Sequence, residues 1–584
     1  MAKSKRSKES SSSIISIFLY FFVFMTFVGL TNIYLFHRFY KDSDYVHANG
    51  LDPTNIRGSG SNLSLENSEN SVLSSDAVEK VINSGFRASN IHAVAGLNCE
   101  DHGGPSNDIA KEMIFWNDIK SDADYKSPFY DEEKYITFEP DSGGFNNIRM
   151  AYETILVLAH ATGRTLVLPP EKKMYLLGKG PKEHKKEFGF NDFFHLDAIS
   201  MEHEGMNIIT MEEFLKRKGL TGQLKHLVTG EVMKPPGNQV DWNGKSLGTL
   251  WEYLRKVGKY PDHWSPGTCV AAIPASPDPK HVEELRQMHQ EILNGQHGGV
   301  PNPENDFIDA PVEVDAPAVE RLREIMASRK EICIYDSELQ NEQLLHFKVD
   351  HSVKARMLTH FYSFIFFQDW KQDLWSKRFV RDHIRYVDDI VCAAARIVNA
   401  VRERARKNSP ENVKGEYDSF HVRRGDFQYK GTRVEAQVLY QESKEHLKEG
   451  GTLYIATDER DKSFFDPLKN HYDVTFLDDY MDLIEGVNAN YYGMLDQLVA
   501  YKGKVFYGTY RSTLSGYINR MRGYYSTKEK LPGYELGTLP SYYFVPQDKK
   551  YAMTKYSAVK LPLFMQEFPV SWRDIDKGTE ELHQ

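Results

Sequence analysis

The first regular pattern of apolar and polar positions begins near residue 134. Residues 135–138 (Tyr-Ile-Thr-Phe) are typical of a strand, and the Glu-Pro-Asp-Ser-Gly-Gly sequence after them is typical of a loop. Apolar residues then recur at helical spacing from 146 to 159, and residues 164–168 predict a second strand. Strand, glycine loop, helix and strand in this order predict a βαβ unit, from which doubly wound α/β sheets are built.

A second α/β pattern lies in the C-terminal part of the chain. Its predicted strands are residues 418–422, 452–457, 474–477 and 504–507, and its predicted helices are 434–447, 491–501 and 512–521. Between the two patterns, residues 172–350 contain breaks rich in proline and glycine, which we interpret as long insertions. Residues 356–401 are predicted to be helical, with an aromatic stripe that fits a core better than a cofactor site. We therefore expect an α/β protein with two Rossmann-like domains that face each other across a cleft.

The N-terminal part of the chain has a different pattern. Residues 14–36 carry no charge, and a helix of that length spans about 30 Å of hydrocarbon. Lysines and an arginine precede it, so the positive-inside rule places the short N-terminus in the cytosol and the rest of the chain in the lumen. The run ends in Asn-Ile-Tyr-Leu-Phe-His, a poor cleavage site, which favours a signal anchor over a cleaved signal peptide. The polar, low-complexity segment that follows is typical of a flexible stem and includes the glycosylation sequon Asn62-Leu63-Ser64.

These patterns predict the organisation of the whole chain. The predicted parts are a cytosolic tail (1–13), a transmembrane signal anchor (14–36), a stem and lead-in (37–126), an N-terminal Rossmann-like domain with insertions (127–375), a C-terminal Rossmann-like domain (376–540) and a C-terminal extension (541–584). We expect a single-pass type II protein of the Golgi or endoplasmic reticulum membrane, with its folded part in the lumen.

Charge and cysteine content narrow the class of protein. The 584-residue chain has a net charge of −10, which argues against a nucleic-acid-binding protein, because such proteins need a basic surface. The four cysteines, Cys99, Cys269, Cys333 and Cys392, are too far apart in the sequence for a zinc-binding motif. In an oxidising lumen they could form disulfides, with the pairing left open. We nevertheless expect Cys333 and Cys392 to be buried as small hydrophobic residues.

Candidate chemistry lies at the end of the predicted strand 418–422. His421 and Arg423 alternate along the strand, so both point to one side, while Val422 and Arg424 point to the other. Open α/β sheets bind ligands at the carboxyl ends of their strands, and a guanidinium at such a place can hold a diphosphate through two hydrogen bonds. The alternative is that Arg423 and Arg424 form structural pairs, for instance with Asp426.

Two further segments fit phosphate binding. Residues 508–515 follow a predicted strand and begin a helix, where Ser512 and Thr513 could bind an anion together with free backbone N–H groups, or could be a plain N-cap. The glycines of the loop 142–147 allow a ligand to approach the backbone closely, although Asn146 or Asn147 could equally be a helix cap.

Three motifs occur together and in order along the chain. They are Gly143-Gly-Phe-Asn-Asn-Ile-Arg149, His421-Val-Arg-Arg-Gly-Asp-Phe427 and Gly508-Thr-Tyr-Arg-Ser-Thr-Leu-Ser515. They resemble the peptide motifs of the GDP-fucose protein O-fucosyltransferase family, whose superfamily includes the plant O-fucosyltransferase-like proteins and the α1,6-fucosyltransferases. The resemblance covers residues 134–168 and 417–525. It implies a GT-B fold, GDP-fucose as donor, inversion at the anomeric carbon, and no metal or other cofactor.

The resemblance also implies roles for individual residues. Arg423 matches the arginine that binds the β-phosphate and is required for catalysis, and His421 matches the donor-site histidine beside it. The other matches to the donor site are Gly144, Phe145 and Asn146 in the loop under the diphosphate, Ser512 and Thr513 as the hydroxyl pair at the phosphates, and Asp496 as the aspartate that reads the guanine. The expected partners are GDP-fucose, a protein or glycan acceptor and the membrane, with no nucleic acid.

The chain departs from the family pattern at two positions. Gly143 stands where some members have a glutamate as catalytic base, and Leu514 stands where a phenylalanine is usual. Other members also lack that glutamate. The base is therefore left open among Glu139, Asp141, Asp426, and assistance from the acceptor or a water.

The Asp-x-Asp pattern of metal-dependent glycosyltransferases occurs at residues 122–124 and 574–576, away from the ends of the predicted strands, and we interpret both as solvated charge.

Two alternative functions stay open. One is a non-catalytic Golgi lectin or scaffold that keeps the fold. The other is a glycosyltransferase that uses a different nucleotide sugar.

Overall fold

The chain divides into two compact units, Met1–Arg87 and Ala88–Gln584, and all residues with a described structure belong to the second. The computed structural model describes residues 96–117, 119–178, 185–244, 246–261, 264–301, 312–326, 329–349, 357–425, 429–529, 540–544, 553–555 and 575–576. Within these ranges no helix has the length and apolar character needed to cross a bilayer. The predicted anchor at 14–36 and the sequon at Asn62 lie outside them.

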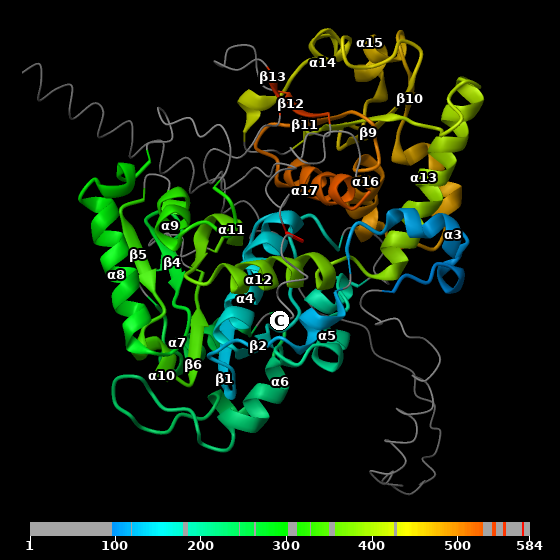
Figure 1. Cartoon of the computed structure of the whole chain (residues 1–584). Coiled ribbons are helices and arrows are strands. Elements are labelled where there is room, and N and C mark those ends of the chain that lie inside the picture. The colour runs from blue at the N-terminus through cyan, green and yellow to red at the C-terminus, as the bar shows by residue number, and fades with distance from the viewer. Residues whose placement is uncertain are drawn as a thin grey trace, which may run out of the picture. The chain divides into compact units, whose positions relative to one another are not determined.

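A four-stranded parallel sheet, in the order β3-β2-β1-β6, forms the N-terminal α/β layer. Figure 1 labels β1, β2 and β6 of this sheet. Its strands are β1 (Asp131–Phe138), β2 (Arg164–Leu168), β3 (Ile208–Thr210) and β6 (Leu344–Phe347). Helix α4 (Phe145–Thr162) connects β1 to β2, which confirms the predicted βαβ unit. Nearly all of α4 is buried, because it packs against the sheet on one side and against α12 (Trp370–His383) and α17 (Thr513–Lys528) on others.

A three-stranded parallel sheet is formed partly by residues predicted as insertions. It has the order β5-β4-β7, with β4 at Cys269–Ile273, β5 at Glu331–Ile334 and β7 at Ile365–Phe367. Strand β7 corrects the prediction of a continuous helical stretch over 356–401. This stretch instead contains α11 (Phe361–Phe364), β7, α12 and α13 (Asp388–Asn408). A short buried Ile-Phe-Phe run suits a strand, and periodicity alone does not distinguish it from a helical segment.

A six-stranded sheet forms the C-terminal layer, in the order β10-β9-β8-β11-β12-β13. The strands are β8 (Asp418–Val422), β9 (Thr452–Thr457), β10 (Asp473–Thr475), β11 (Phe506–Thr509), β12 (Ser541–Phe544) and β13 (Met553–Lys555). All neighbours are parallel except β12 and β13. Strands β8 and β9 have the predicted boundaries, and the parallel sheets confirm the α/β class. The last two strands lie beyond residue 540, in the segment interpreted from the sequence as an extension.

The remaining helices surround these sheets (Figure 1). They are α3 (Asn107–Ala110), α5 (Leu196–Glu202), α6 (Met211–Phe214), α7 (Leu247–Val257), α8 (Pro279–Leu293), α9 (Ala318–Met326), α10 (Ser337–Asn341), α14 (Ala436–Ser443), α15 (Asp466–Lys469) and α16 (Tyr492–Ala500).

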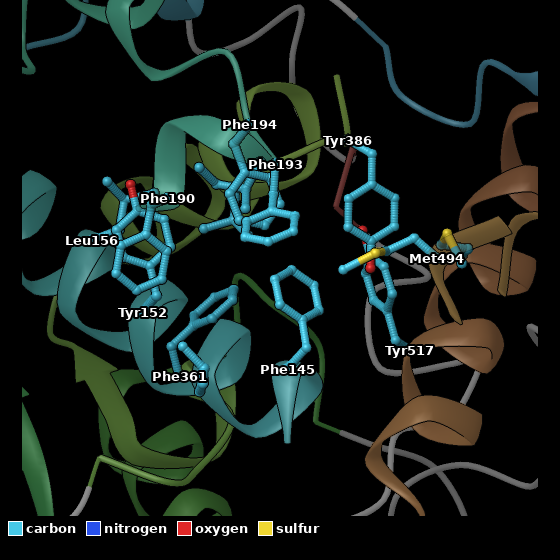
Figure 2. Packing of buried hydrophobic residues seen from close by; sticks show 14 of the residues in the cluster. Phe145, Tyr152, Leu156, Phe190, Phe193, Phe194, Phe361, Tyr386, Met494 and Tyr517 are labelled. Atoms are coloured by element: carbon cyan, nitrogen blue, oxygen red, sulfur yellow. The ribbon is translucent and has the colours of Figure 1, made fainter. Parts of the chain in front are cut away.

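One hydrophobic core joins the N-terminal and C-terminal α/β layers. Figure 2 shows Phe145 of α4 in the same cluster as Met494 of α16 and Tyr517 of α17. Buried charges lie beside this core. Arg520 of α17 donates two hydrogen bonds to Glu153 of α4, at 2.9 and 2.7 Å, and Arg149 of α4 also pairs with Glu153. Because buried charges are stable only when paired, these contacts hold α4 and α17 in one arrangement.

All four cysteines form disulfides, Cys99–Cys392 and Cys269–Cys333. The expectation that Cys333 and Cys392 are buried is correct, but the expectation that they are merely small hydrophobic residues is wrong. Cys392 of α13 bonds to the lead-in before α3, and Cys333 of β5 bonds to the neighbouring strand β4. The folded part of the chain therefore begins before residue 134, where the sequence pattern first becomes regular.

One aspartate of each Asp-x-Asp sequence, Asp122 and Asp576, is not plain solvated charge, whereas Asp124 is exposed as expected and Asp574 lies outside the described residues. Asp122 is buried and accepts hydrogen bonds from Arg378 at 2.5 and 3.0 Å. Asp576 accepts one from Arg381 at 2.6 Å. Both arginines belong to α12 and are almost fully buried, so each needs a carboxylate to compensate its charge.

Candidate functional site

A cavity of about 590 Å³ lies among the loops that follow β1, β8 and β11. Its lining includes residues 142–147 and 175–177, residues 421, 423 and 429, several residues of 489–497, and residues 511–514. Strands β8 and β11 are parallel neighbours, so they end at the same edge of the sheet, where α/β proteins bind ligands. The volume lies within the range of about 300–1,000 Å³ that is usual for small-molecule sites.

The glycine loop brings backbone to the surface of this cavity. Gly144 is the N-cap of α4, with φ −61° and ψ 161°. A Cβ built on Gly144 would meet no heavy atom within 4 Å, whereas a Cβ on Gly143 would lie 2.7 Å from the Asn147 side chain. A ligand can therefore approach Gly144 closely. By contrast, a glutamate at position 143 would have to displace Asn147.

The two asparagines of the loop bind the C-terminal layer and do not cap α4. Gln497 donates from Nε2 to Asn146 Oδ1 at 2.8 Å, and Thr513 donates from Oγ1 to Asn147 Oδ1 at 2.9 Å. Phe145 also lines the cavity, and its ring packs on Phe193 with 4.5 Å between the ring centroids. The loop is thus fixed to both α16 and α17 at the edge of the cavity.

At the end of β8, His421 and Arg423 both line the cavity, as the alternation of the strand predicts. Arg423 Nη1 lies 2.8 Å from Asp458 Oδ2, and the Arg423 backbone N–H donates to Thr509 Oγ1 at 2.9 Å. Burial, together with the charge of Arg423, lowers the pKa of His421 to about 3. The imidazole is therefore neutral at physiological pH, and its Nδ1 is hydrogen-bonded to Ser515 Oγ at 2.6 Å.

Arg424 forms a structural ion pair, the alternative that the sequence left open for both Arg423 and Arg424. Its Nε lies 3.0 Å from Glu459 Oε2, and its guanidinium carbon lies 3.8 Å from the centroid of the Phe464 ring. It does not line the cavity. Asp426, the partner considered from the sequence, lies outside the described residues.

The segment before α17 brings hydroxyl groups to the cavity. Ser512 and Thr513 both line it. The Thr513 hydroxyl donates to Asn147, whereas the Ser512 hydroxyl makes no hydrogen bond within the described residues. Ser512 is therefore the member of the pair whose proton is available to a ligand. The first backbone N–H groups of α17 are also without partners inside the helix, as at every helix start.

Asp496 is the predicted site residue that the structure does not bring to the cavity lining. Gly493, Met494 and Gln497 of the same helix do line it. Asp496 instead accepts a hydrogen bond from the Tyr454 hydroxyl of β9 at 2.7 Å. Burial raises the pKa of Asp496 to about 7, so the carboxyl is partly protonated at neutral pH.

The candidate bases before the glycine loop are also absent from this lining. Glu139 accepts hydrogen bonds from Arg255 at 2.6 and 2.7 Å. Burial would raise the pKa of Glu139, but hydrogen bonds from His346 and Arg255 outweigh it and hold the pKa below its usual value. Asp141 accepts the Gly143 N–H at 2.7 Å and so shapes the loop. Among the described residues that line the cavity there is no aspartate or glutamate.

Sequence reasoning missed many residues of the lining, among them Tyr429, Gln497 and Arg511. Arg511 stands inside the third motif, but its backbone has φ 63°, a left-handed conformation that nothing in the local sequence signals. Gln497 follows Asp496 directly, so the helical pattern gave no reason to prefer it.

The chain is similar to proteins of one known family. A model of the GDP-fucose protein O-fucosyltransferase family matches residues 135–525, a range that contains all three motifs. The chain belongs to this family. The resemblance stated from the motifs is thereby confirmed, and this O-fucosyltransferase family member carries Gly143 and Leu514 at the two atypical positions. No curated protein matches the chain.

Several solved fucosyltransferase structures show weak similarity to this family member. The crystal structure of POFUT1 in its apo form is 14% identical with a TM-score of 0.30, covering 67% of this chain and 95% of that one. POFUT1 in complex with GDP-fucose is 14% identical with a TM-score of 0.29, covering 68% and 96%. The fucosyltransferase NodZ from Bradyrhizobium is 12% identical with a TM-score of 0.28, covering 73% and 99%. TM-scores this low carry no argument, and membership rests on the family model.

Proposed function

We propose that the protein transfers fucose from GDP-fucose to a hydroxyl group of a protein or glycan in the secretory pathway, with inversion at the anomeric carbon and without a metal ion. The observation that supports this most is the composition of the cavity. One cavity gathers Arg423, the available Ser512 hydroxyl, the open backbone at Gly144 and the starts of two long helices. These are the groups that bind a diphosphate, and the described lining adds no carboxylate that would repel it.

The proposed chemistry requires stabilisation of a leaving diphosphate. The bond that breaks joins the anomeric carbon of fucose to an oxygen of the β-phosphate, so negative charge grows on the diphosphate. Helices α4 and α17 begin at the cavity, where the positive ends of their dipoles face such a group. Arg423 adds a full positive charge, and Asp458 orients its guanidinium. A preorganised donor aimed at developing charge contributes about 3 kcal/mol to catalysis.

The acceptor hydroxyl attacks the anomeric carbon from the face opposite the diphosphate, which inverts the configuration. Its proton leaves as the new C–O bond forms. Because Glu139 and Asp141 do not line the cavity and Gly143 offers no carboxylate, we propose that a water or a group of the acceptor takes this proton. Asp426, outside the described residues, is the remaining side-chain candidate. Neutral His421 adds a hydrogen-bonding group beside Arg423 without adding charge.

At the base end of the nucleotide, we propose that Asp496 reads guanine. An ionised carboxylate can accept both the N1–H and the N2–H of this base. Asp496 belongs to the helix that contributes Gly493 and Met494 to the lining. In this role its side chain would leave Tyr454 and turn toward the nucleotide.

We further propose that residues 14–36 anchor the protein in the Golgi or endoplasmic reticulum membrane, with the folded part in the lumen. The two disulfides support this location, because disulfides persist in oxidising compartments and are rare in the cytosol.

Arg423 and Arg424 allow a matched test of the donor site. Both are arginines paired with a carboxylate, but only Arg423 lines the cavity. We expect Arg423→Gln to weaken GDP binding by about ten- to a hundredfold, since a charge-assisted hydrogen bond contributes about 1.5–3 kcal/mol, and to abolish fucose transfer. Arg424→Gln should keep the affinity for GDP within about twofold of the wild type, provided thermal unfolding shows that it is folded.

Calorimetry with GDP measures both variants. Equal affinity of the wild type and Arg423→Gln for GDP would show that Arg423 does not belong to the donor site. A protein that binds GDP but consumes no nucleotide sugar in a donor screen would instead be a scaffold that keeps the fold, and consumption of another nucleotide sugar would reassign the donor.

A further inference from the structure

Arg511 has an unusual backbone conformation at the edge of the cavity. Among the described residues, four non-glycine residues have positive φ, and two of them, Leu176 and Arg511, line this cavity. A residue with a side chain adopts this left-handed conformation only where the surrounding structure enforces it, and such residues concentrate at ligand sites. The surrounding fold therefore fixes the direction in which the Arg511 side chain extends from the backbone.

Arg511 also differs from Arg423 in exposure and in partners. Arg423 is partly buried and paired with Asp458, whereas Arg511 is exposed, which places it at the opening of the cavity. Within the part of the chain that the structure describes, Arg511 makes no ion pair and no hydrogen bond. Its guanidinium carbon lies 5.5 Å from the ring centroid of Tyr429 and 5.8 Å from that of Tyr510.

We propose that Arg511 and Tyr429 form a subsite for the acceptor and that the acceptor carries an anionic group, a carboxylate or a sulfate, near the hydroxyl that receives the sugar. This inference rests on the proposed function. The charge of the donor diphosphate is already met by Arg423, Ser512 and the starts of α4 and α17. The exposed guanidinium of Arg511 at the opening is therefore left for the acceptor.

The surroundings of Arg511 fit an anionic sugar or peptide group. A guanidinium binds carboxylate and sulfate through two parallel hydrogen bonds, and the Tyr429 ring offers a flat surface for the adjoining part of the ligand. The whole chain has a net charge of −10, so an acidic acceptor would be repelled unless positive charge were concentrated at the site. The described lining provides this concentration, because its only charged residues are Arg423 and Arg511, with no aspartate or glutamate.

The test compares two sugars that differ in charge. Glucuronate and glucose are titrated into the full-length protein saturated with GDP, at low ionic strength, and binding is followed by saturation-transfer NMR. We expect the wild type to bind glucuronate about fivefold more tightly than glucose, a difference of the size found for exposed charge pairs. Arg511→Gln should remove this preference. Arg511→Lys should retain part of it, because lysine keeps the charge but not the two-pronged geometry.

Control measurements make each outcome decisive. Tyr429→Leu should also reduce the preference for glucuronate, and thermal unfolding should show that every variant is folded. Equal binding of the two sugars by the wild type, or an unchanged preference in Arg511→Gln, would overturn the proposal. A tenfold loss of GDP affinity in Arg511→Gln would overturn it too and assign Arg511 to the donor. A wild type that binds no GDP would instead refute the proposed function on which the inference rests.

Discussion

At the scale of single residues, charge is distributed asymmetrically around the cavity. Arg423 and Arg511 line it, while nearby carboxylates are turned away and occupied: Glu139 by Arg255 and Asp496 by Tyr454. Asp458 is a carboxylate that reaches a lining arginine, since its Oδ2 lies 2.8 Å from Arg423 Nη1. An anionic ligand therefore meets positive charge in this cavity.

Asp496→Asn tests the raised pKa of the half-buried Asp496. Burial raises the pKa of Asp496 to about 7, from the ordinary aspartate value of 3.8. Between these two values the folded state binds the proton more tightly than the unfolded state, so the free energy of unfolding falls as the pH rises. Asparagine keeps the shape but cannot ionise. We expect the Tm of Asp496→Asn to exceed that of the wild type by a margin that grows from pH 5 to pH 8, because the wild type loses stability over this range as the pH rises toward the pKa of the folded state.

The same variant reports on guanine recognition. If the ionised carboxylate reads guanine, Asp496→Asn binds GDP more weakly than the wild type near pH 8, where the wild type is ionised. Scanning calorimetry and GDP titration at both pH values measure the two effects. A difference in Tm that is the same at both pH values would contradict the raised pKa.

At the scale of elements, the site is made by two helix starts that are fixed to each other. The loop before α4 bonds to α16 through Asn146 and to α17 through Asn147. Deeper in the core, Glu153 of α4 pairs with Arg520 of α17. The two helix starts therefore cannot move apart without breaking buried polar contacts, which keeps the proposed phosphate-binding groups in place before a ligand arrives.

Gly144→Ala tests whether the ligand lies against the start of α4. The backbone of Gly144 suits alanine, and the added Cβ meets no protein atom within 4 Å, so stability should be unchanged. The Cβ would, however, fill space that a bound phosphate needs, and we expect the affinity for GDP to fall by about tenfold or more. Gly431→Ala is the matched control, because its Cβ is equally unobstructed but the residue does not line the cavity.

Calorimetry with GDP and with guanosine measures this effect. The loss in Gly144→Ala should appear with GDP and be much smaller with guanosine, which has no phosphate. Wild-type affinity for GDP in Gly144→Ala would show that the diphosphate lies elsewhere.

The elements beside the cavity could be predicted from the sequence because local patterns determine them. Strands β8 and β9 are short apolar runs between turn residues, and both were predicted with their observed boundaries. The remaining features depend on contacts between distant segments. Cys392 meets a partner 293 residues away, Asp122 is held by Arg378, and the outward direction of Arg511 depends on a left-handed backbone. None of these leaves a periodic signal in the local sequence.

At the scale of the whole molecule, the described chain is an α/β protein. Its N-terminal and C-terminal α/β layers both contribute residues to the lining of one cavity. The N-terminal layer contributes the glycine loop, and the C-terminal layer contributes Arg423, Ser512 and the start of α17. The disulfide Cys99–Cys392 ties the lead-in to α13, and the family match spans both layers. The central claim is that this cavity binds the diphosphate of a guanine nucleotide with protein groups alone.

Titration of GDP into the full-length wild-type protein, once with EDTA and once with Mn²⁺, tests this claim most directly. We predict that GDP binds in both solutions, with Kd values within about twofold of each other, because arginine, hydroxyl and helix N–H groups replace the metal. Absence of GDP binding, or binding that appears only with Mn²⁺, would contradict the account.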